Sequence, residues 1–212
     1  LEIGCGWGGF AEHLGKNYDI KLDCITISKK QLEFAKKRIF NAGLNEKVDI
    51  KFLDYRDVQG KYDSIASIEM IEAVGEKYLK KYFSSIKNNL KSNGVAAIQA
   101  IVIRDELFDR YRKNEDFIQK YIFPGGFLPS LQSIRSSCKD TGLELTDYNS
   151  YGMHYSNTLR TWRENFIRSW SDISKQGFDQ SFKKIWDFYF SYCEAGFKAK
   201  NIDLIQFSIC NK

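Results

Sequence analysis

The opening run of the chain, Leu1 to Phe10, constrains the possible folds more than any other segment. It reads as a short strand that carries an acidic residue, Glu2, and runs directly into clustered glycines. Glycine permits a sharp strand-to-helix turn and lets backbone amides at a helix N-terminus approach a ligand closely. Because Gly4, Gly6 and Gly9 also satisfy the G-x-G-x-x-G dinucleotide pattern, the run predicts a nucleotide cofactor without specifying which one.

The rest of the chain supports an α/β domain. Apolar runs alternate with helical patterns through the first half, which is typical of a parallel sheet flanked by helices. Strands are predicted over residues 1–3, 22–27, 48–53, 62–68, 95–103, 143–151 and 204–209, and helices over 10–17, 29–41, 77–90 and 133–141. The predicted fold class is a doubly wound, mostly parallel sheet with a helical, aromatic-rich insertion before the last strand.

Two aromatic helices form this insertion. Apolar side chains recur at helical spacing as Tyr155, Leu159, Trp162, Phe166 and Trp170, and as Phe178, Phe182, Ile185, Trp186, Tyr189, Cys193 and Phe197. Such stripes usually pack into a core. We interpret the second stripe as core and the first as part of a pocket. We expect one domain over residues 1–212, with helical elements at 104–142 and 153–200 on its substrate side.

Composition excludes several classes of protein. The net charge of +5 comes from lysines dispersed among acids, which is too dilute for a nucleic-acid footprint. It suits weak attraction to anionic surfaces such as lipid headgroups, although a solvated lysine-rich surface is the simpler interpretation. Five scattered cysteines without CxxC spacing argue against a disulfide framework or zinc site. No histidine pair has metal-ligand spacing, so we expect no catalytic metal.

The ends of the chain and its hydropathy bear on location. No apolar stretch reaches the roughly 20 residues of a membrane span, and no signal peptide is visible, so we expect a cytoplasmic protein. The chain has no initiator methionine and starts inside a strand. We therefore expect an upstream segment of the natural protein to be missing here.

Residues around the glycine run help to distinguish two cofactors. A carboxylate at Glu2 can attract the ammonium of an amino-acid moiety, which S-adenosylmethionine carries and a dinucleotide lacks. Dinucleotide enzymes place an acid at the end of the second strand to bind ribose, but Thr26 and Ile27 stand there, with Gln31 able to reach back. Asp23 precedes the strand end. The pattern favours S-adenosylmethionine, with Gly4, Gly6 and Gly8 in its turn, over a nicotinamide cofactor.

A polar cluster begins at Asp54 and Tyr55, directly after the third strand. Open α/β sheets bind ligands at the carboxyl ends of their strands. Asp54 could accept a hydrogen bond from the adenine amino group, and Tyr55 could pack on the ring. The alternative is an ordinary loop with a helix cap.

The segment after the fourth strand, Ser67 to Gly75, places two carboxylates in an apolar setting. A buried glutamate is costly unless it is paired or serves a function. Glu72 is therefore the best single catalytic candidate. His154 could orient the site, although a lone histidine is more often a structural hydrogen-bonding residue.

Taken in order, these motifs resemble one family. They are Leu1 to Phe10, Ile25-Thr26-Ile27-Ser28, Asp54-Tyr55-Arg56-Asp57, Glu72-Ala73-Val74-Gly75, Lys120 to Ser130 and His154 to Leu159. The chain resembles the cyclopropane-fatty-acyl-phospholipid synthases over essentially its whole length. The segment Tyr-Ile-Phe-Pro-Gly-Gly-x-Leu-Pro-Ser is the most specific part, because the glycine turn occurs in many methyltransferases.

The resemblance implies a class I methyltransferase fold and methyl transfer from S-adenosylmethionine to the cis double bond of a phospholipid acyl chain. The resulting carbocation would become a cyclopropane when a proton leaves the added methyl. The resemblance also implies a bound bicarbonate as base, with Glu72 and Tyr155 among its holders and Ile101 offering backbone. Gln99 stands where familiar members carry histidine, and glutamine cannot titrate near neutral pH.

The expected partners are unsaturated phospholipid acyl chains at a membrane surface, with peripheral association; a homodimer is an open alternative. We expect no nucleic acid. Three other functions stay open: a lipid methyltransferase that leaves a methyl or methylene branch, a non-catalytic membrane-associated binding module, and, least favoured, a nicotinamide dehydrogenase.

Overall fold

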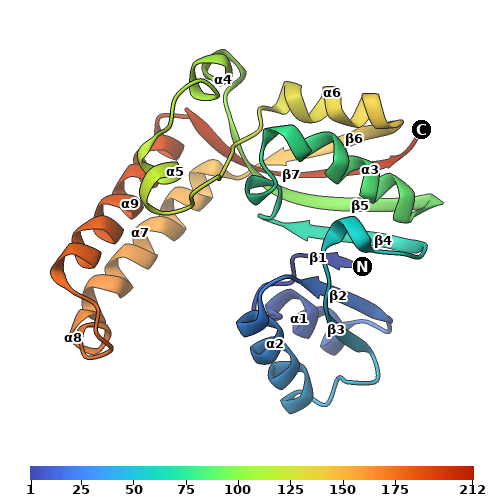
Figure 1. Ribbon diagram of the computed structural model, residues 1–212, viewed down its shortest axis with the longest axis horizontal. Helices are drawn as coiled ribbons and strands as arrows, with labels where there is room; N and C mark the ends of the chain where they lie inside the picture. Colours follow the sequence, from blue (N-terminus) through green and yellow to red (C-terminus); the bar gives the residue numbers. More distant parts are fainter.

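A seven-stranded sheet forms the centre of the computed structural model, which describes all residues from 1 to 212 (Figure 1). Its strands are β1 (Glu2–Ile3), β2 (Leu22–Thr26), β3 (Val48–Phe52), β4 (Tyr62–Ile68), β5 (Leu90–Ile103), β6 (Leu143–Ser150) and β7 (Ile202–Asn211). The order across the sheet is β3-β2-β1-β4-β5-β7-β6. All pairs from β3 to β5 are parallel, and β7 is antiparallel to both β5 and β6. This is the topology of the class I methyltransferase fold, so the predicted fold class is confirmed.

Nine α-helices connect or cover the strands. They are α1 (Gly9–Asn17), α2 (Lys29–Asn41), α3 (Leu79–Asn89), α4 (Asp105–Tyr111), α5 (Phe117–Tyr121), α6 (Leu131–Thr141), α7 (Gly152–Arg168), α8 (Trp170–Ser174) and α9 (Gln180–Lys198). Short 3-10 turns cover Tyr55–Asp57, Ile71–Ala73 and Glu76–Tyr78. None of these helices has both the length and the apolar character that crossing a membrane would require.

Local sequence explains where several helices begin and end. The side chain of Ser28 accepts a hydrogen bond from the amide of Gln31, which caps the start of α2. Ser130 and Ser133 form a reciprocal capping box at the start of α6. Gly142 then ends α6 in the left-handed conformation, with φ of 73°.

The main core lies between the sheet and helices α3 and α6. Tyr82, Phe83 and Ile86 of α3 and Ile134 of α6 are fully buried there against β4, β5 and β7. Burial of each large apolar side chain contributes roughly 1.5–3 kcal/mol relative to leaving it exposed. A smaller core joins α1 and α2 to β2 and β3, and a third joins α7 and α9 to β7.

Helices α7 and α9 lie side by side and extend away from one end of the sheet, where both contact β7 (Figure 1). Leu159, Phe190, Phe197 and Leu204 form the buried contact between this pair and β7. Helix α5 lies beside α9 in the same part of the molecule, where Phe117 meets Phe188 with ring centroids 4.7 Å apart. The helical insertion therefore stands over one end of the sheet.

Two predictions about boundaries need correction. The strand predicted over 95–103 starts earlier: β5 begins at Leu90, so Ser92, Asn93 and Gly94 lie inside it, and it shifts register against β4 before Val95. The range 104–142 is divided: α4 and α5 lie on the cavity side described below, whereas α6 packs Ile134 and Cys138 into the main core. Helix α6 is amphipathic, and its apolar face packs against the sheet.

Candidate active site

Three glycines shape the turn between β1 and α1, and the surroundings of each differ in the space they leave for a side chain. Gly4, Gly6 and Gly8 have positive φ values of 77°, 52° and 76°. A Cβ on Gly4 would lie 2.9 Å from the Cγ of Met70, and one on Gly8 would lie 3.0 Å from the Cβ of Ala35. A Cβ on Gly6 would meet nothing within 4 Å. Gly6 therefore faces open space, where a ligand can approach the backbone.

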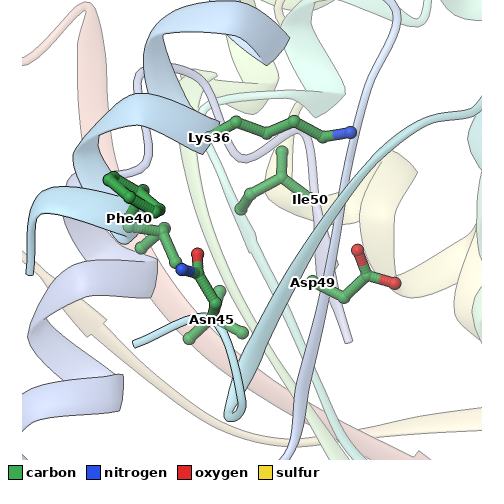
Figure 2. A pocket seen from close by; sticks show the side chains of 7 residues that line it. Lys36, Phe40, Asn45, Asp49 and Ile50 are labelled. Carbon is green, nitrogen blue, oxygen red and sulfur yellow. The ribbon is translucent and has the colours of Figure 1, made fainter. Parts of the chain in front are cut away.

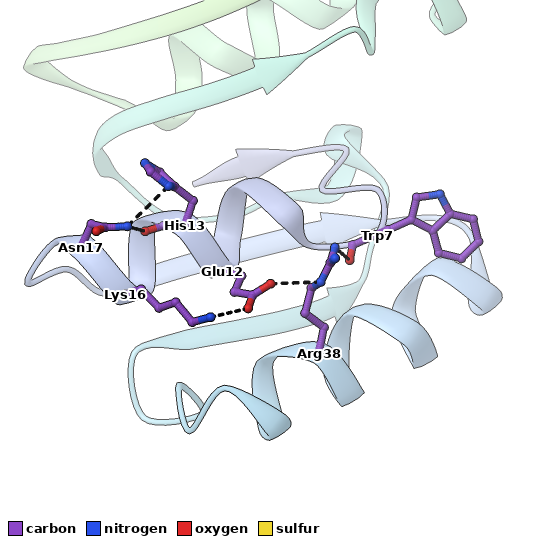
Figure 3. A network of polar contacts seen from close by, with 6 residues as sticks. All are labelled: Trp7, Glu12, His13, Lys16, Asn17 and Arg38. Carbon is purple, nitrogen blue, oxygen red and sulfur yellow. Dashed lines mark hydrogen bonds and ion pairs between the residues drawn. The ribbon is translucent and has the colours of Figure 1, made fainter. Parts of the chain in front are cut away.

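The glycine turn is held from α2 by Arg38 (Figure 3). Its Nη1 donates a 2.9 Å hydrogen bond to the carbonyl of Trp7, and its Nε lies 3.1 Å from Oε2 of Glu12. Glu12 also accepts from Lys16, and the ring of Trp7 points outward with 53% of its surface exposed. One guanidinium thus ties the turn and α1 to α2.

Glu2 lies beneath the turn and is only 3% exposed. The thiol of Cys24 donates to its Oε2 at 3.3 Å. Burial raises the pKa of the Glu2 carboxyl. The carboxyl is therefore within the body of the sheet, and its predicted contact with an ammonium group stays a prediction.

The carboxyl end of β2 carries a small hydrogen-bonded unit. The hydroxyl of Thr26 donates to Oε1 of Gln31 at 2.8 Å and accepts from the amide of Ser28 at 3.1 Å. Ile27 leaves 68% of its surface exposed beside this unit. Asp23, the nearby acid, is engaged by Lys51 and Tyr62 at the start of the strand. No acid is free at this strand end to hold a nicotinamide cofactor's ribose.

Asp54 and Tyr55 have partners within the protein. Oδ1 of Asp54 accepts from both the amide and Nε of Arg56 at 2.9 Å, and Oδ2 accepts from Nη2 at 2.7 Å. This pairing lowers the pKa of the Asp54 carboxyl. The ring of Tyr55 meets Tyr82 edge-on. The segment is thus a capped loop, as the alternative interpretation holds, and its predicted role toward adenine stays a prediction.

A cavity of about 1120 Å³ lies among the helical insertion, α5 and the segment that follows β4. Twenty-two of its 31 lining residues are hydrophobic, so it suits a long apolar ligand better than a polar one. The aromatic residues that line it are Tyr111, Phe123, Phe127, Tyr155, Trp162, Trp186, Tyr189, Phe190, Tyr192 and Phe197. The first aromatic helix lines a pocket as predicted, but the core-only interpretation of the second was wrong. Helix α9 contributes both to the core and to the cavity wall, because its broad apolar face packs against α7 on one side and lines the cavity on the other.

Glu72 brings a buried carboxyl to the wall of this cavity. Its Oε1 accepts a 2.5 Å hydrogen bond from the backbone amide of Ile101, and its buried Oε2 has no partner. Burial, followed by a smaller effect of the nearby charge of Glu69, raises the pKa of Glu72 to about 7. The backbone amide of Phe127 binds the carbonyl of Glu72, which fixes the loop across the cavity.

A second carboxylate, Glu69, gathers the other predicted site residues. Its Oε2 accepts from the hydroxyl of Tyr155 at 2.9 Å, and its Oε1 accepts from Nε2 of Gln99 at 2.8 Å. Oε1 of Gln99 in turn accepts from Nε2 of Gln206 at 2.8 Å. The structure therefore brings Glu72, Tyr155, Gln99 and the backbone of Ile101 into one region.

Sequence reasoning missed the parts played by Glu69 and Gln206. Two carboxylates in one apolar segment were a usable signal for Glu69, but only the buried partner, Glu72, was singled out. Gln206 carried no signal, because its pairing with Gln99 depends on the antiparallel register of β5 and β7. His154 is exposed and does not line the cavity. No group of three or more metal-binding side chains is present.

A second hollow, of about 340 Å³, lies between α2 and β3 (Figure 2). Its charged residues are Lys36 and Asp49, and none of the predicted site residues lines it. We therefore leave it out of the candidate site.

Fold and site together define a class I methyltransferase domain with a large apolar cavity beside a buried acid. The chain belongs to the mycolic acid cyclopropane synthetase family, which it matches over residues 1–207.

Two curated relatives are similar along nearly the whole chain. It is 40% identical to the tuberculostearic acid methyltransferase UfaA1 of Mycobacterium tuberculosis, over 99% of this chain and 49% of that protein. It is 36% identical to the cyclopropane-fatty-acyl-phospholipid synthase of Escherichia coli K12, over 97% and 51%. The chain thus spans about half the length of these relatives.

A solved structure extends the comparison to the fold. The crystal structure of the mycolic acid cyclopropane synthase CmaA1 complexed with SAH and CTAB matches with a TM-score of 0.90 at 25% identity. The match covers 100% of this chain and 77% of that one.

Proposed function

We propose that this protein transfers a methyl group from S-adenosylmethionine to the cis double bond of an unsaturated phospholipid acyl chain and forms a cyclopropane by way of a carbocation. The observation that carries the proposal is the buried carboxyl of Glu72 on the wall of a large apolar cavity that Tyr155 also lines. The family supports lipid methyl transfer in general, and the cyclopropane product is our more specific proposal.

S-adenosylmethionine fits the glycine turn for reasons of space and polarity. Gly6 leaves its backbone open, and Ile27 offers an exposed apolar surface at the carboxyl end of β2. Gln31 lies beside this surface, held by Thr26. The cofactor, when bound, supplies an electrophilic methyl on a sulfonium. Met70 connects the turn to the segment of Glu72, because it packs against Gly4.

The cavity explains how a cation could survive long enough to react. Water would capture a carbocation, and a mostly hydrophobic wall offers water few hydrogen-bonding partners. Ring faces such as those of Tyr155 and Trp162, whose centroids lie 5.9 Å apart, can stabilise a cation by about 0.5–2 kcal/mol each without attacking it. The same wall accommodates an acyl chain.

The bicarbonate implied by the resemblance does not fit the arrangement of side chains. Tyr155 and Gln99 would have to donate to it, but both donate to Glu69. The amide of Ile101 donates to Glu72. These three donors already bind carboxylates of the protein, so the proposed mechanism does not use bicarbonate as the base.

A second candidate keeps the chemistry of methyl transfer but leaves a methyl or methylene branch. Gln99 favours it, because an amide cannot relay a proton near neutral pH as a histidine can. The 40% identity to a protein named as a tuberculostearic acid methyltransferase favours it as well. Product structure separates the two, since only a ring gives the strongly shielded protons of cyclopropane in NMR.

We also propose that the substrate is met at a membrane surface. Tyr121 and Phe123 near α5, and Phe188 and Tyr192 on α9, are exposed aromatic residues beside the cavity. Aromatic rings of this kind favour the interface between water and lipid. Lys120 adds a positive charge 5.4 Å from the ring of Tyr121. The homodimer stays a prediction, which light scattering of the purified protein would check.

The test uses the complete gene product, S-adenosylmethionine labelled in its methyl group, and vesicles of an unsaturated phospholipid. We expect label in the acyl chain and a product whose mass has increased by one methylene unit. No label in lipid, with S-adenosylhomocysteine still bound, would reject the enzyme and favour a binding module. Binding of NADH in place of S-adenosylhomocysteine would revive the dehydrogenase.

A further inference from the structure

We propose that the carboxylate of Glu69 stands in the place of a bound anion and is itself the base that accepts the proton in the final step. This inference rests on the proposed function. The resemblance implies bicarbonate as the base, whereas here the base is a side chain of the protein itself.

The hydrogen-bond donors at the site identify the position. Tyr155 donates to one oxygen of Glu69 at 2.9 Å and Gln99 donates to the other at 2.8 Å. These are two of the residues that the resemblance assigns to an anion with a planar carboxylate-like group. A side-chain carboxylate has the same shape, charge and accepting atoms, and it already receives both bonds.

The orientation of the Gln99 amide is fixed from the opposite side. Nε2 of Gln206 donates to Oε1 of Gln99, so the NH₂ group of Gln99 must point to Glu69. The backbone amide of Glu69 also donates to the carbonyl of Gln99 at 2.9 Å. Glu69 is therefore bound to Gln99 through both its side chain and its main chain.

The backbone at Glu69 shows that this placement is imposed by its surroundings. Glu69 has φ of 50°, and only one other non-glycine residue, Lys200, has a positive φ. A glutamate in this conformation is strained and persists only where neighbouring contacts hold it, which is common at functional sites. The strained turn places the carboxylate on the wall of the apolar cavity.

The carboxyl groups of Glu72 and Glu69 differ in burial and in hydrogen bonding, which suits two separate roles. Glu72 is buried, and its pKa of about 7 keeps much of it protonated near neutral pH. Glu69 faces the cavity, and each of its two carboxylate oxygens accepts one hydrogen bond. Neighbouring carboxyl groups in unlike environments differ in how tightly they hold a proton, and the ring-closing step needs only a base.

The step balances without any further reactant. The π electrons of the double bond form a bond to the methyl carbon, while the bond from that carbon to sulfur breaks and leaves its electrons on sulfur. The cation then loses a proton from the added methyl. The electrons of that C–H bond close the ring, and the proton passes to Glu69 and later to solvent. Such a cation is so strong an acid that a carboxylate suffices as base.

The experiment compares the complete gene product with Glu69→Gln and Glu69→Gly, in buffer freed of carbon dioxide and in buffer with added bicarbonate. Glu144→Gln is the matched control, because Glu144 is exposed on β6 and outside the cavity. Turnover is measured as labelled lipid. Independently, the line width of ¹³C-bicarbonate in NMR reports anion binding to each protein loaded with S-adenosylhomocysteine.

We expect wild-type turnover to change less than about twofold on removal of bicarbonate, and its ¹³C line to stay narrow. Glu69→Gln should lose at least roughly 100-fold in turnover, which is the usual effect of removing a general base. Glu69→Gly opens the space and suits the positive φ, so bicarbonate should restore its turnover and show a broadened, saturable line.

A wild-type protein that needs bicarbonate, or that broadens its resonance, would overturn the proposal. So would wild-type turnover in Glu69→Gln. If the wild type labels no lipid at all, the proposed function fails instead, and the NMR comparison still decides whether Glu69 occupies the anion position. That comparison needs only folded protein, which circular dichroism verifies for each variant.

Discussion

The hydroxyl of Tyr155 donates a 2.9 Å hydrogen bond to Oε2 of Glu69, and this bond joins residues 86 positions apart in the sequence. It connects the first turns of α7 to the carboxyl end of β4. The phenol is largely withdrawn from water, and burial together with the negative charges of Glu69 and Glu72 raises its pKa. Tyr155 therefore stays a neutral donor at every physiological pH.

Replacing Tyr155 with phenylalanine should lower turnover by roughly 10- to 100-fold, since it removes one of two donors that position Glu69. The ring, and with it the wall of the cavity, stays. Affinity for S-adenosylhomocysteine, measured by calorimetry, should change less than about twofold. Tyr148→Phe is the control, because Tyr148 is exposed on β6 away from the cavity. Equal turnover in the two variants would show that the Tyr155 hydroxyl is idle.

Glu72→Gln should abolish turnover and leave cofactor binding nearly intact. Glutamine can keep the bond from the Ile101 amide through its oxygen, but it cannot take up the proton that Glu69 must pass on after each turnover. Single-turnover assays with labelled cofactor measure the first effect and calorimetry the second. A collapse of cofactor affinity would mean that Glu72 supports the glycine turn rather than the chemistry.

The same residue should make stability depend on pH. Burial raises the pKa of Glu72 to about 7 from a value of 4.5, so the folded state binds this proton more tightly than the unfolded state does. Its contribution to stability is therefore full below pH 4.5 and is lost as the pH rises through 7. Between pH 5 and 8 the loss amounts to about 2–3 kcal/mol.

Urea denaturation of wild type and Glu72→Gln at both pH values isolates this effect from all other titrations. Relative to wild type, the free energy of unfolding of the variant should be about 2–3 kcal/mol higher at pH 8 than it is at pH 5. A constant difference between the two proteins would show that Glu72 ionises normally.

Much of the fold could be predicted because local patterns and global topology agree. The predicted helix over 29–41 matches α2 residue for residue, since Ser28 supplies a cap and Gly43 a left-handed exit. The early start of β5 could not be predicted. Leu90 pairs with Tyr62 across the sheet, and tertiary pairing outweighed the turn-forming composition of Ser92-Asn93-Gly94.

The candidate site was predictable only in part, for a similar reason. Glu72 was visible as an acid in an apolar segment, and Tyr155 within an aromatic stripe. The network of Glu69, Gln99 and Gln206 depends on strand register and on a strained backbone, and neither leaves a pattern in one sequence. The same holds for α9, whose stripe is broad enough to serve core and cavity at once.

Arg38 offers a test of the brace on the glycine turn. Arg38→Met keeps the aliphatic stem but removes the bonds to the Trp7 carbonyl and to Glu12. We expect affinity for S-adenosylhomocysteine to fall roughly tenfold, or about 1.4 kcal/mol, as the turn loosens. Lys37→Met, one position away on the exposed face of α2, should leave calorimetric affinity unchanged. Equal affinities would show that the turn is rigid without the arginine.

Alanine at Gly6 and at Gly8 should separate ligand binding from packing. Both positions have positive φ, so each alanine incurs about 1 kcal/mol of backbone strain. At Gly8 the new Cβ would also lie 3.0 Å from Ala35 and push α1 from α2, which adds roughly 1–3 kcal/mol. Thermal unfolding should therefore show the larger loss of stability for Gly8→Ala.

Gly6→Ala should show the reverse. No protein atom lies within 4 Å of its new Cβ, so little stability is lost beyond the strain, and the methyl projects into the space left for the cofactor. Affinity for S-adenosylhomocysteine should fall at least roughly tenfold, a larger change than the stability loss explains. Unchanged affinity in Gly6→Ala would place the cofactor away from this turn and remove the basis for assigning it there.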